Sequence, residues 1–288
     1  MPGSRVVLAV SDIAPARERS WAAGLLRLQQ DQSPRLLVDR VYHGSRPLVI
    51  DAHRVAVQRG EEGPEPEGPE VRQHLRIDSL SIDIVDSETG DAHTIYGWTG
   101  YETHLAGLYG SELIVYRVGP AGADLIGVHL ADGAQRSIVA SWPPAARDFS
   151  IDAEHGALIA QQLAPNSSHH WQIERVELAT GQSSVLATSR HADMMPFSWP
   201  SGGVLHQPEG AGAPAFLEQS RSLQFPPTTS PLWVRATSTD GAWVAALGLQ
   251  PHAFPIPVAI RVQDGRAATI PTRPGERPEI AGFVGGSP

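Results

Sequence analysis

Short apolar runs occur in pairs along the chain, and the two runs of a pair are joined by a polar turn containing Gly, Asp, Ser or Thr. The chain also contains 28 Gly and 25 Pro. Both residues interrupt helix interiors and favour turns, so this many of them would be unusual in a helical protein of 288 residues. The sequence therefore predicts an all-β protein built from short strands.

Four of the pairs carry a Thr-Gly or Asp-Gly turn, and each predicts an antiparallel hairpin because Gly adopts a positive φ without steric cost. Their strands and turns are Leu80 to Val85, Thr89-Gly90 and His93 to Tyr96; Leu125 to Leu130, Asp132-Gly133 and Gln135 to Ala140; Ile173 to Leu178, Thr180-Gly181 and Ser183 to Ala187; and Val258 to Val262, Asp264-Gly265 and Arg266 to Ile270. Successive turn glycines are 43, 48 and 84 residues apart, and 84 is twice 42. This spacing is typical of the blades of a β-propeller.

A second kind of hairpin precedes each of these and would supply the two inner strands of a four-stranded blade. The ranges are Ser45 to Val57, Leu105 to Val118, Phe149 to Leu163, Phe197 to His206 and Trp233 to Leu249. Counting both kinds predicts a six-bladed propeller, with seven blades as the alternative. The blade near Ala213 to Phe225 is the weakest, because Pro and Gly interrupt it.

The two ends of the chain are expected to share one blade. Arg5 to Ala14, Leu25 to Gln29 and Leu36 to Tyr42 read as three strands of a blade that lacks its innermost strand. Glu279 to Val284 has the character of that strand, and we expect it to pair beside Arg5 to Ala14. Such pairing would close the ring and remove the exposed sheet edge of an open propeller. We therefore expect residues 1–288 to form a single domain.

Three segments carry a resemblance to a known family. They are Ile82 to Gly90, Arg175 to Gly181 and Ser238 to Ala245. They resemble the TolB-like, WD-repeat-like propeller repeats of bacteria, in which a Ser-Pro-Asp-Gly type turn precedes an apolar strand and a Thr-Gly element follows. The Pro is absent from the Ser238 to Gly241 turn, and nothing here resembles the separate N-terminal α/β domain of the Tol translocation protein. The resemblance implies a fold, and the Tol partner is not transferred to this chain.

Charge and composition exclude several classes of function. The net charge is −9 and all 22 basic residues are Arg, which leaves no basic footprint for nucleic acid and suggests the codon bias of a high-GC bacterial genome. The absence of Cys excludes disulfides and thiolate chemistry. No apolar run reaches the ~20 residues of a membrane helix, so we expect a soluble protein. As written the chain predicts a cytoplasmic location, or a periplasmic or secreted one if an export signal was removed.

One end of the predicted propeller carries most of the aromatic and His residues found in loops. This end is built from the loops that join the second strand of a blade to the third, and the fourth to the next blade. The candidate binding residues there are Trp98, Tyr101, Trp142, His169, His170, Trp171, His191, Asp193 and Phe254. Aromatic enrichment with few Lys is typical of a protein-binding surface, and the alternative is that these side chains brace the loops.

Two further features bear on metal binding. The segment Arg59 to Arg72 carries five Glu among Gly and Pro, and we interpret it as a solvated acidic insertion that cannot hold calcium at fixed angles. His169-His170 and His191 to Asp193 have side chains that suit zinc or iron. Because 12 His along a chain produce such pairs easily, we predict no metal site and no cofactor.

The sequence contains no motif that assigns a catalytic residue. It has no Gly-x-Ser-x-Gly elbow and no Gly-rich phosphate loop. The favoured hypothesis is a non-catalytic, monomeric binding or scaffold protein that engages a protein or peptide through the loop face. The alternative is a propeller enzyme, a hydrolase or lyase acting on a sugar, lactone or peptide at the mouth of the central channel. Two or more carboxylates or His converging there would favour catalysis.

Overall fold

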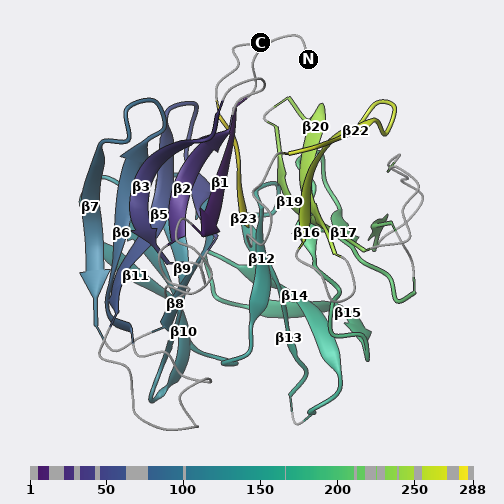
Figure 1. Cartoon of the computed structure of the whole chain (residues 1–288). Coiled ribbons are helices and arrows are strands. Elements are labelled where there is room, and N and C mark those ends of the chain that lie inside the picture. The colour runs from purple at the N-terminus through teal and green to yellow at the C-terminus, as the bar shows by residue number, and fades with distance from the viewer. Residues whose placement is uncertain are drawn as a thin grey trace, which may run out of the picture.

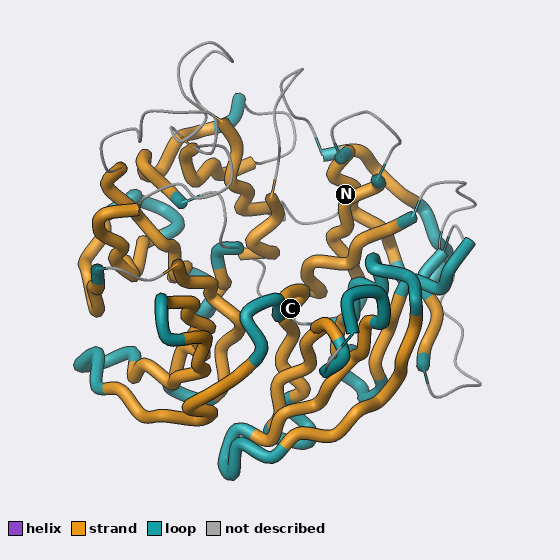
Figure 2. Tube along the Cα trace, turned by 90° about the horizontal axis from the view of Figure 1, so that it is seen from below, coloured by secondary structure: helices purple, strands orange, loops and turns teal. Residues whose placement is uncertain are grey.

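The computed structural model describes residues 6–12, 23–28, 33–42, 46–62, 77–99, 102–165, 167–210, 213–217, 225, 231–238, 240–249, 255–270 and 279–284. Within these ranges the chain forms β-strands and turns, with no helix (Figure 1). It follows that no helix in the described ranges is long and apolar enough to cross a membrane. The all-β prediction is confirmed. The sheets stand around a common centre, in the arrangement of a β-propeller (Figure 2).

The largest sheet holds eight strands in the order β23-β1-β2-β3-β5-β6-β7, and β4 pairs with β5. These strands are β1 (Val6–Asp12), β2 (Ala23–Leu28), β3 (Arg35–Val41), β4 (Leu48–Val49), β5 (Arg54–Glu62), β6 (Ile77–Asp86), β7 (Ala92–Trp98) and β23 (Glu279–Val284). A single pair of residues, Val41 and Arg59, joins β3 to β5. The sheet thus consists of two antiparallel groups of four strands connected at one point.

Four smaller sheets complete the fold. Three have four strands: β8 (Glu102–Tyr109) to β11 (Gln135–Trp142), with β9 (Glu112–Gly119) and β10 (Gly122–His129); β12 (Arg147–Asp152) to β15 (Ser183–Ser189), with β13 (Ala157–Leu163) and β14 (Trp171–Glu177); and β19 (Leu232–Thr237) to β22 (Ala267–Thr269), with β20 (Trp243–Gly248) and β21 (Ile256–Arg261). The fourth has three short strands, β16 (Phe197–Ser198), β17 (Val204–His206) and β18 (Ala215–Phe216). Strand β18 of this last sheet lies in the weak segment Ala213 to Phe225, of which residues 218–224 are outside the described ranges.

The predicted count of six or seven blades is wrong, because the described strands form five blades. Two groups that the repeat spacing treats as separate blades share one sheet through the Val41–Arg59 pair. The spacing of the turn glycines gives the number of residues in each unit. It does not show whether the edge strands of neighbouring units pair with each other.

The predicted pairing of the two ends of the chain is present. Strand β23 runs antiparallel to β1, with Val6 opposite Val284 and Val10 opposite Glu279. Buried Ile280 of β23 and Leu28 of β2 also belong to one apolar cluster with Leu247 of β20. The last four-stranded sheet therefore packs against the sheet that contains the first strand.

The predicted hairpins are all found, and three of their turn glycines lie against the backbone of the preceding unit. Gly90, Gly133 and Gly181 have φ of +86°, +69° and +72°. A Cβ placed on Gly133 would lie 2.2 Å from the carbonyl oxygen of Ile95 in β7, and one on Gly181 would lie 2.3 Å from that of Ile138 in β11. Each turn thus sits directly on the backbone of the outer strand of the preceding unit.

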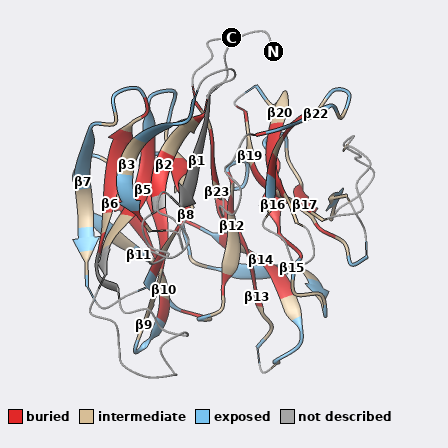
Figure 3. Ribbon diagram, in the orientation of Figure 1, coloured by how far each residue is buried: buried red, intermediate tan, exposed pale blue. Residues whose placement is uncertain are grey.

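Buried residues lie along the strands of the successive sheets (Figure 3), and apolar clusters connect one sheet to the next. One cluster joins Leu125 of β10 to Leu158 of β13, and another joins Ile173 of β14 to Val204 of β17. The innermost strands also contact one another, β4 with β8, β8 with β12, and β12 with β16. These contacts fix where the first residues of the innermost strands lie, and several of those residues are charged.

The expected acidic insertion lies largely outside the described residues. Arg59 to Glu62 belong to strand β5, and the structure does not describe residues 63–76.

Candidate functional site

Seven of the nine candidate binding residues lie in the described part of the chain, and Tyr101 and Phe254 lie outside it. Trp142 is only 7% exposed. Its ring centroid lies 5.6 Å from that of Tyr116 and 6.2 Å from that of Phe149, so it belongs to the core between two sheets. Trp98 ends β7 in the eight-stranded sheet. The remaining five residues lie in or beside the sheet of β12 to β15.

Two of those five residues, Trp171 and Asp193, contact an arginine, Arg147, that the sequence analysis did not single out. His169 and His170 precede Trp171 in the chain, and His191 is half-buried, with its backbone N–H donating to Ser189 Oγ at 2.9 Å. Arg147 begins β12, and its guanidinium carbon lies 4.8 Å from the centre of the Trp171 ring, within the range of a cation–π contact. Its Nη2 donates to Asp193 Oδ1 at 3.1 Å and to the carbonyl oxygen of Ala192. Arg147 therefore connects β12, β14 and the 190–196 loop. We call Arg147, His169, His170, Trp171, Arg190 and Asp193 the Arg147 patch.

The loop that carries Asp193 is held in place by a buried glutamine. Gln161 Oε1 accepts hydrogen bonds from the backbone N–H groups of Met194 and Met195 at 2.9 and 3.1 Å, and Gln161 Nε2 donates to the carbonyl oxygen of Ala192. Met195 has a φ of +48°, an uncommon conformation for a residue other than Gly. The three contacts keep this loop against β13 and so fix the position of Asp193.

The histidines of this face are organised by short polar contacts. Ser167 Oγ accepts hydrogen bonds from the backbone N–H groups of His169 and His170 at 3.2 and 2.9 Å, and lies 3.1 Å from His170 Nδ1. Arg190 Nε donates to His170 Nε2 at 3.4 Å. In the described ranges, no group of three or more His, Asp or Glu side chains is arranged to hold a metal ion. These contacts give a surface of hydrogen-bond donors beside an indole ring.

A second cluster, of four charged residues, lies near the centre of the propeller and was missed by the sequence analysis. Arg235 Nε forms an ion pair with Glu279 Oε1 at 2.6 Å, and the two side chains are 8% and 14% exposed. Arg46 Nη1 donates to the carbonyl oxygen of Arg235 at 2.7 Å. Burial, and secondarily the Arg235 charge, lower the pKa of Arg46 to about 9.

The fourth member of this central cluster is Asp148. Burial raises its pKa, and the opposing effects of Arg147 and Arg235 are smaller. Asp148 has a φ of +56° and lies where the β12–β13 register shifts between Arg147 and Ser150. The shift is a β-bulge, a device that redirects side chains. In the sequence, each of the four is a charged residue at or near the start of a predicted innermost strand, a signal that does not by itself show that the four meet.

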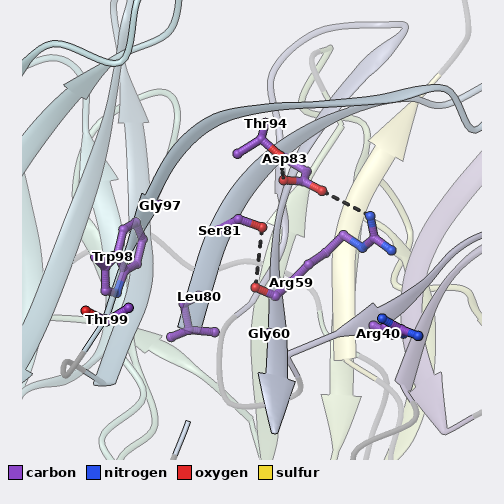
Figure 4. A pocket seen from close by; sticks show the side chains of 10 residues that line it. All are labelled: Arg40, Arg59, Gly60, Leu80, Ser81, Asp83, Thr94, Gly97, Trp98 and Thr99. Atoms are coloured by element: carbon purple, nitrogen blue, oxygen red, sulfur yellow. Dashed lines mark hydrogen bonds and ion pairs between the residues drawn. The ribbon is translucent and has the colours of Figure 1, made fainter. Parts of the chain in front are cut away.

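A pocket of about 660 Å³ lies on the eight-stranded sheet, between β3 and the face formed by β5, β6 and β7 (Figure 4). We call it the Arg40 pocket. On its wall Arg59 Nη1 contacts Asp83 Oδ2 at 3.2 Å, and the Thr94 hydroxyl donates to Asp83 Oδ1 at 2.8 Å. Trp98 and Leu80 line the pocket at one end and Arg40 lines it from β3.

Comparisons with known proteins define the fold class. TolB from Acinetobacter baumannii superimposes with a TM-score of 0.62 at 14% identity, over 97% of this chain and 67% of that chain. A putative TolB from Agrobacterium tumefaciens gives 0.60 at 10% identity, over 97% and 93%. A chain of a nidogen–laminin complex gives 0.54 at 10% identity, over 98% of this chain and 98% of that chain.

The fold is therefore that of the TolB-like β-propellers, as the sequence resemblance implied. No protein-family model and no curated protein matches the sequence. At these identities the likeness establishes the fold alone.

Proposed function

We propose that this chain is a non-catalytic binding or scaffold protein that engages a protein or peptide through the Arg147 patch. The observation that carries the proposal is the fixed position of Arg147 over Trp171. The Arg147 side chain remains 43% exposed although Asp193 and the Ala192 carbonyl hold it. An arginine and an aromatic ring that are ordered before binding lose little conformational entropy on contact with a partner, and both residue types are enriched among the energetically dominant residues of interfaces.

The arrangement of the loops supports a macromolecular partner. The patch draws on β12, the 164–170 loop, β14 and the 190–196 loop, so it presents several segments at one surface. Its exposed His169, His170 and Arg190 offer donors around the indole ring. One protein with a similar fold was crystallised in a nidogen–laminin complex. We further propose that the chain acts as a monomer, that residues 1–288 form one domain, and that the β1–β23 pairing closes the propeller.

The test compares the binding of a candidate partner to four purified proteins. They are the wild type, Arg147→Ala, Trp171→Ala, and Gln182→Ala as the control. Gln182 is exposed in the β14–β15 turn at the opposite end of the same sheet. A partner identified with the wild type should lose at least about tenfold in affinity for the two patch variants and keep its affinity for the control. Equal affinities for all four proteins would exclude the patch as the binding surface.

A second candidate function is catalysis at the propeller centre, by a hydrolase or lyase. It is favoured by the presence of two carboxylates, Asp148 and Glu279, on innermost strands around Arg46 and Arg235. The raised pKa of Asp148 is a property that general acids use. Against it, Glu279 already accepts from Arg235 at 2.6 Å. An activity found with a sugar, lactone or peptide substrate and abolished in Asp148→Asn would establish the enzyme and replace the binding hypothesis.

A further inference from the structure

The wall of the Arg40 pocket that β5, β6 and β7 form carries polar side chains. Ser81 and Asp83 point to the same face of β6 because they are two residues apart. Arg59 lies opposite Ser81, and Thr94 lies opposite Asp83. The Asp83 side chain is 5% exposed and bonded to both Arg59 and Thr94. The wall is therefore preorganised by its own hydrogen bonds.

The described residues that line this pocket include two arginines and one carboxylate. Arg59 is compensated twice, by Asp83 Oδ2 at 3.2 Å and by Asp39 Oδ1 at 3.1 Å. The only carboxylate among the described lining residues is Asp83, and Arg59 and Thr94 already occupy it. Arg40 forms no ion pair within the part of the chain that the structure describes. Arg40 is therefore the arginine of the pocket lining that no described carboxylate pairs with.

Arg40, which lines the pocket from β3, has a strained backbone conformation. Arg40 has a φ of +55°, one of three positive values among the described residues other than Gly. The β2–β3 register shifts between the pairs Ala23–Val41 and Leu25–Val38, so Asp39 and Arg40 form a bulge. Without this bulge the alternation along β3 would change the face on which Arg40 lies. Positive φ in such residues costs about 1 kcal/mol or more and is concentrated at binding sites.

The opposite end of the pocket is apolar. Leu80 and Trp98 are paired residues of β6 and β7, and the Trp98 ring lies 4.9 Å from that of Tyr96. The volume of about 660 Å³ falls within the ~300–1,000 Å³ of small-molecule sites. The pocket thus offers a cation at one end and an indole with an aliphatic side chain at the other (Figure 4).

We propose that the Arg40 pocket binds a small organic acid, with its carboxylate on the Arg40 guanidinium and an aromatic or aliphatic body against Trp98 and Leu80. Arginine suits this role because its planar N–H groups match the two oxygens of a carboxylate. None of the Arg147 patch residues lines this pocket, so the site is independent of the proposed partner-binding surface.

The test follows the indole N–H signal of Trp98 by ¹H–¹⁵N NMR. The chain has seven Trp, and the signal missing in Trp98→Phe assigns the residue. The wild type is titrated with phenylacetate, indole-3-acetate and cyclohexanecarboxylate, each beside its neutral amide. At least one acid should shift the signal in a saturable way, and its amide should bind at least about tenfold more weakly because the ion pair is lost.

Variants of Arg40 separate charge recognition from general binding. Arg40→Gln should weaken the acid at least about tenfold, and Arg40→Lys should weaken it less because it keeps the charge. Arg266→Gln, at an arginine that is 81% exposed on another sheet, should bind like the wild type. Since Arg40 is exposed, the variants should keep the wild-type unfolding midpoint. The proposal is refuted if no acid gives a saturable shift, or if acid and amide bind equally well.

Discussion

Replacing a turn glycine by alanine tests how tightly successive units of the propeller are packed. Gly133 ends the β10–β11 turn with a φ of +69°. In Gly133→Ala the new methyl carbon would lie 2.2 Å from the Ile95 carbonyl oxygen, where 3.4 Å or more is an ordinary contact. That oxygen belongs to the backbone of β7, so rotation of a side chain cannot relieve the clash. The turn must instead move away from the preceding unit.

The expected cost has two parts. Placing Ala in the left-handed region costs about 1–2 kcal/mol, and overpacking adds about 1–3 kcal/mol. Gly110→Ala isolates the first part, since Gly110 has a φ of +58° and no atom within 4 Å of the added Cβ. We therefore expect a loss in the free energy of unfolding of about 1–2 kcal/mol for Gly110→Ala and of about 2–5 kcal/mol for Gly133→Ala.

Urea unfolding of the two variants and the wild type, followed by tryptophan fluorescence, measures the difference. Gly181→Ala serves as a second case, because its Cβ would lie 2.3 Å from the Ile138 carbonyl oxygen. Equal losses for Gly110→Ala and Gly133→Ala would refute the view that these turns are packed against the preceding backbone. A change in m-value would show instead that the variant departs from two-state unfolding or alters the compactness of the unfolded chain.

Three further predictions concern the ion pairs and the loop of the candidate sites. Glu279→Ala should lower the free energy of unfolding by about 3–5 kcal/mol because Arg235 is left buried without its partner, and Arg235→Met combined with Glu279→Ala should recover part of it in the same assay. Gln161→Leu leaves the backbone N–H groups of Met194 and Met195 without an acceptor; it should cost about 2 kcal/mol or more and shift the Trp171 indole NMR signal. The Arg261 hydrogen bond lowers the pKa of Asp264 from 3.8 to about 2. The stabilising effect of the Arg261–Asp264 pair should therefore be present above pH 4 and disappear toward pH 2. In Arg261→Gln, carboxyl ¹³C NMR should show the pKa of Asp264 return toward 3.8.

Local sequence signals were sufficient to predict the strands and their turns. Thr89-Gly90, Asp132-Gly133 and Thr180-Gly181 predict hairpins because positive φ is a property of one residue and its neighbours. The pairing of Glu279 to Val284 with the N-terminal strand was also predictable, since the first unit lacked an inner strand. That inference needs only a count of strands in each repeat.

The charged cluster at the centre could not be assembled from the sequence. Arg46, Asp148, Arg235 and Glu279 lie in four segments far apart along the chain, and no segment taken alone shows which charged residues of the other segments it meets. Their proximity depends on how the innermost strands meet. Trp142 illustrates the same limit, because the chain leaves β11 at the predicted face while the indole ring turns into the core against Tyr116.

The sequence by itself thus determined the all-β class, the hairpins and the joining of the chain ends, because alternation and turn chemistry act within a few residues. The tertiary structure decided which units share a sheet, which arginines have carboxylate partners, and where a pocket opens beside Arg40. Those features depend on the residue pair that joins β3 to β5, Val41–Arg59, and on bulges such as Asp39-Arg40. Register and packing over long sequence separations set them, and no local pattern records either.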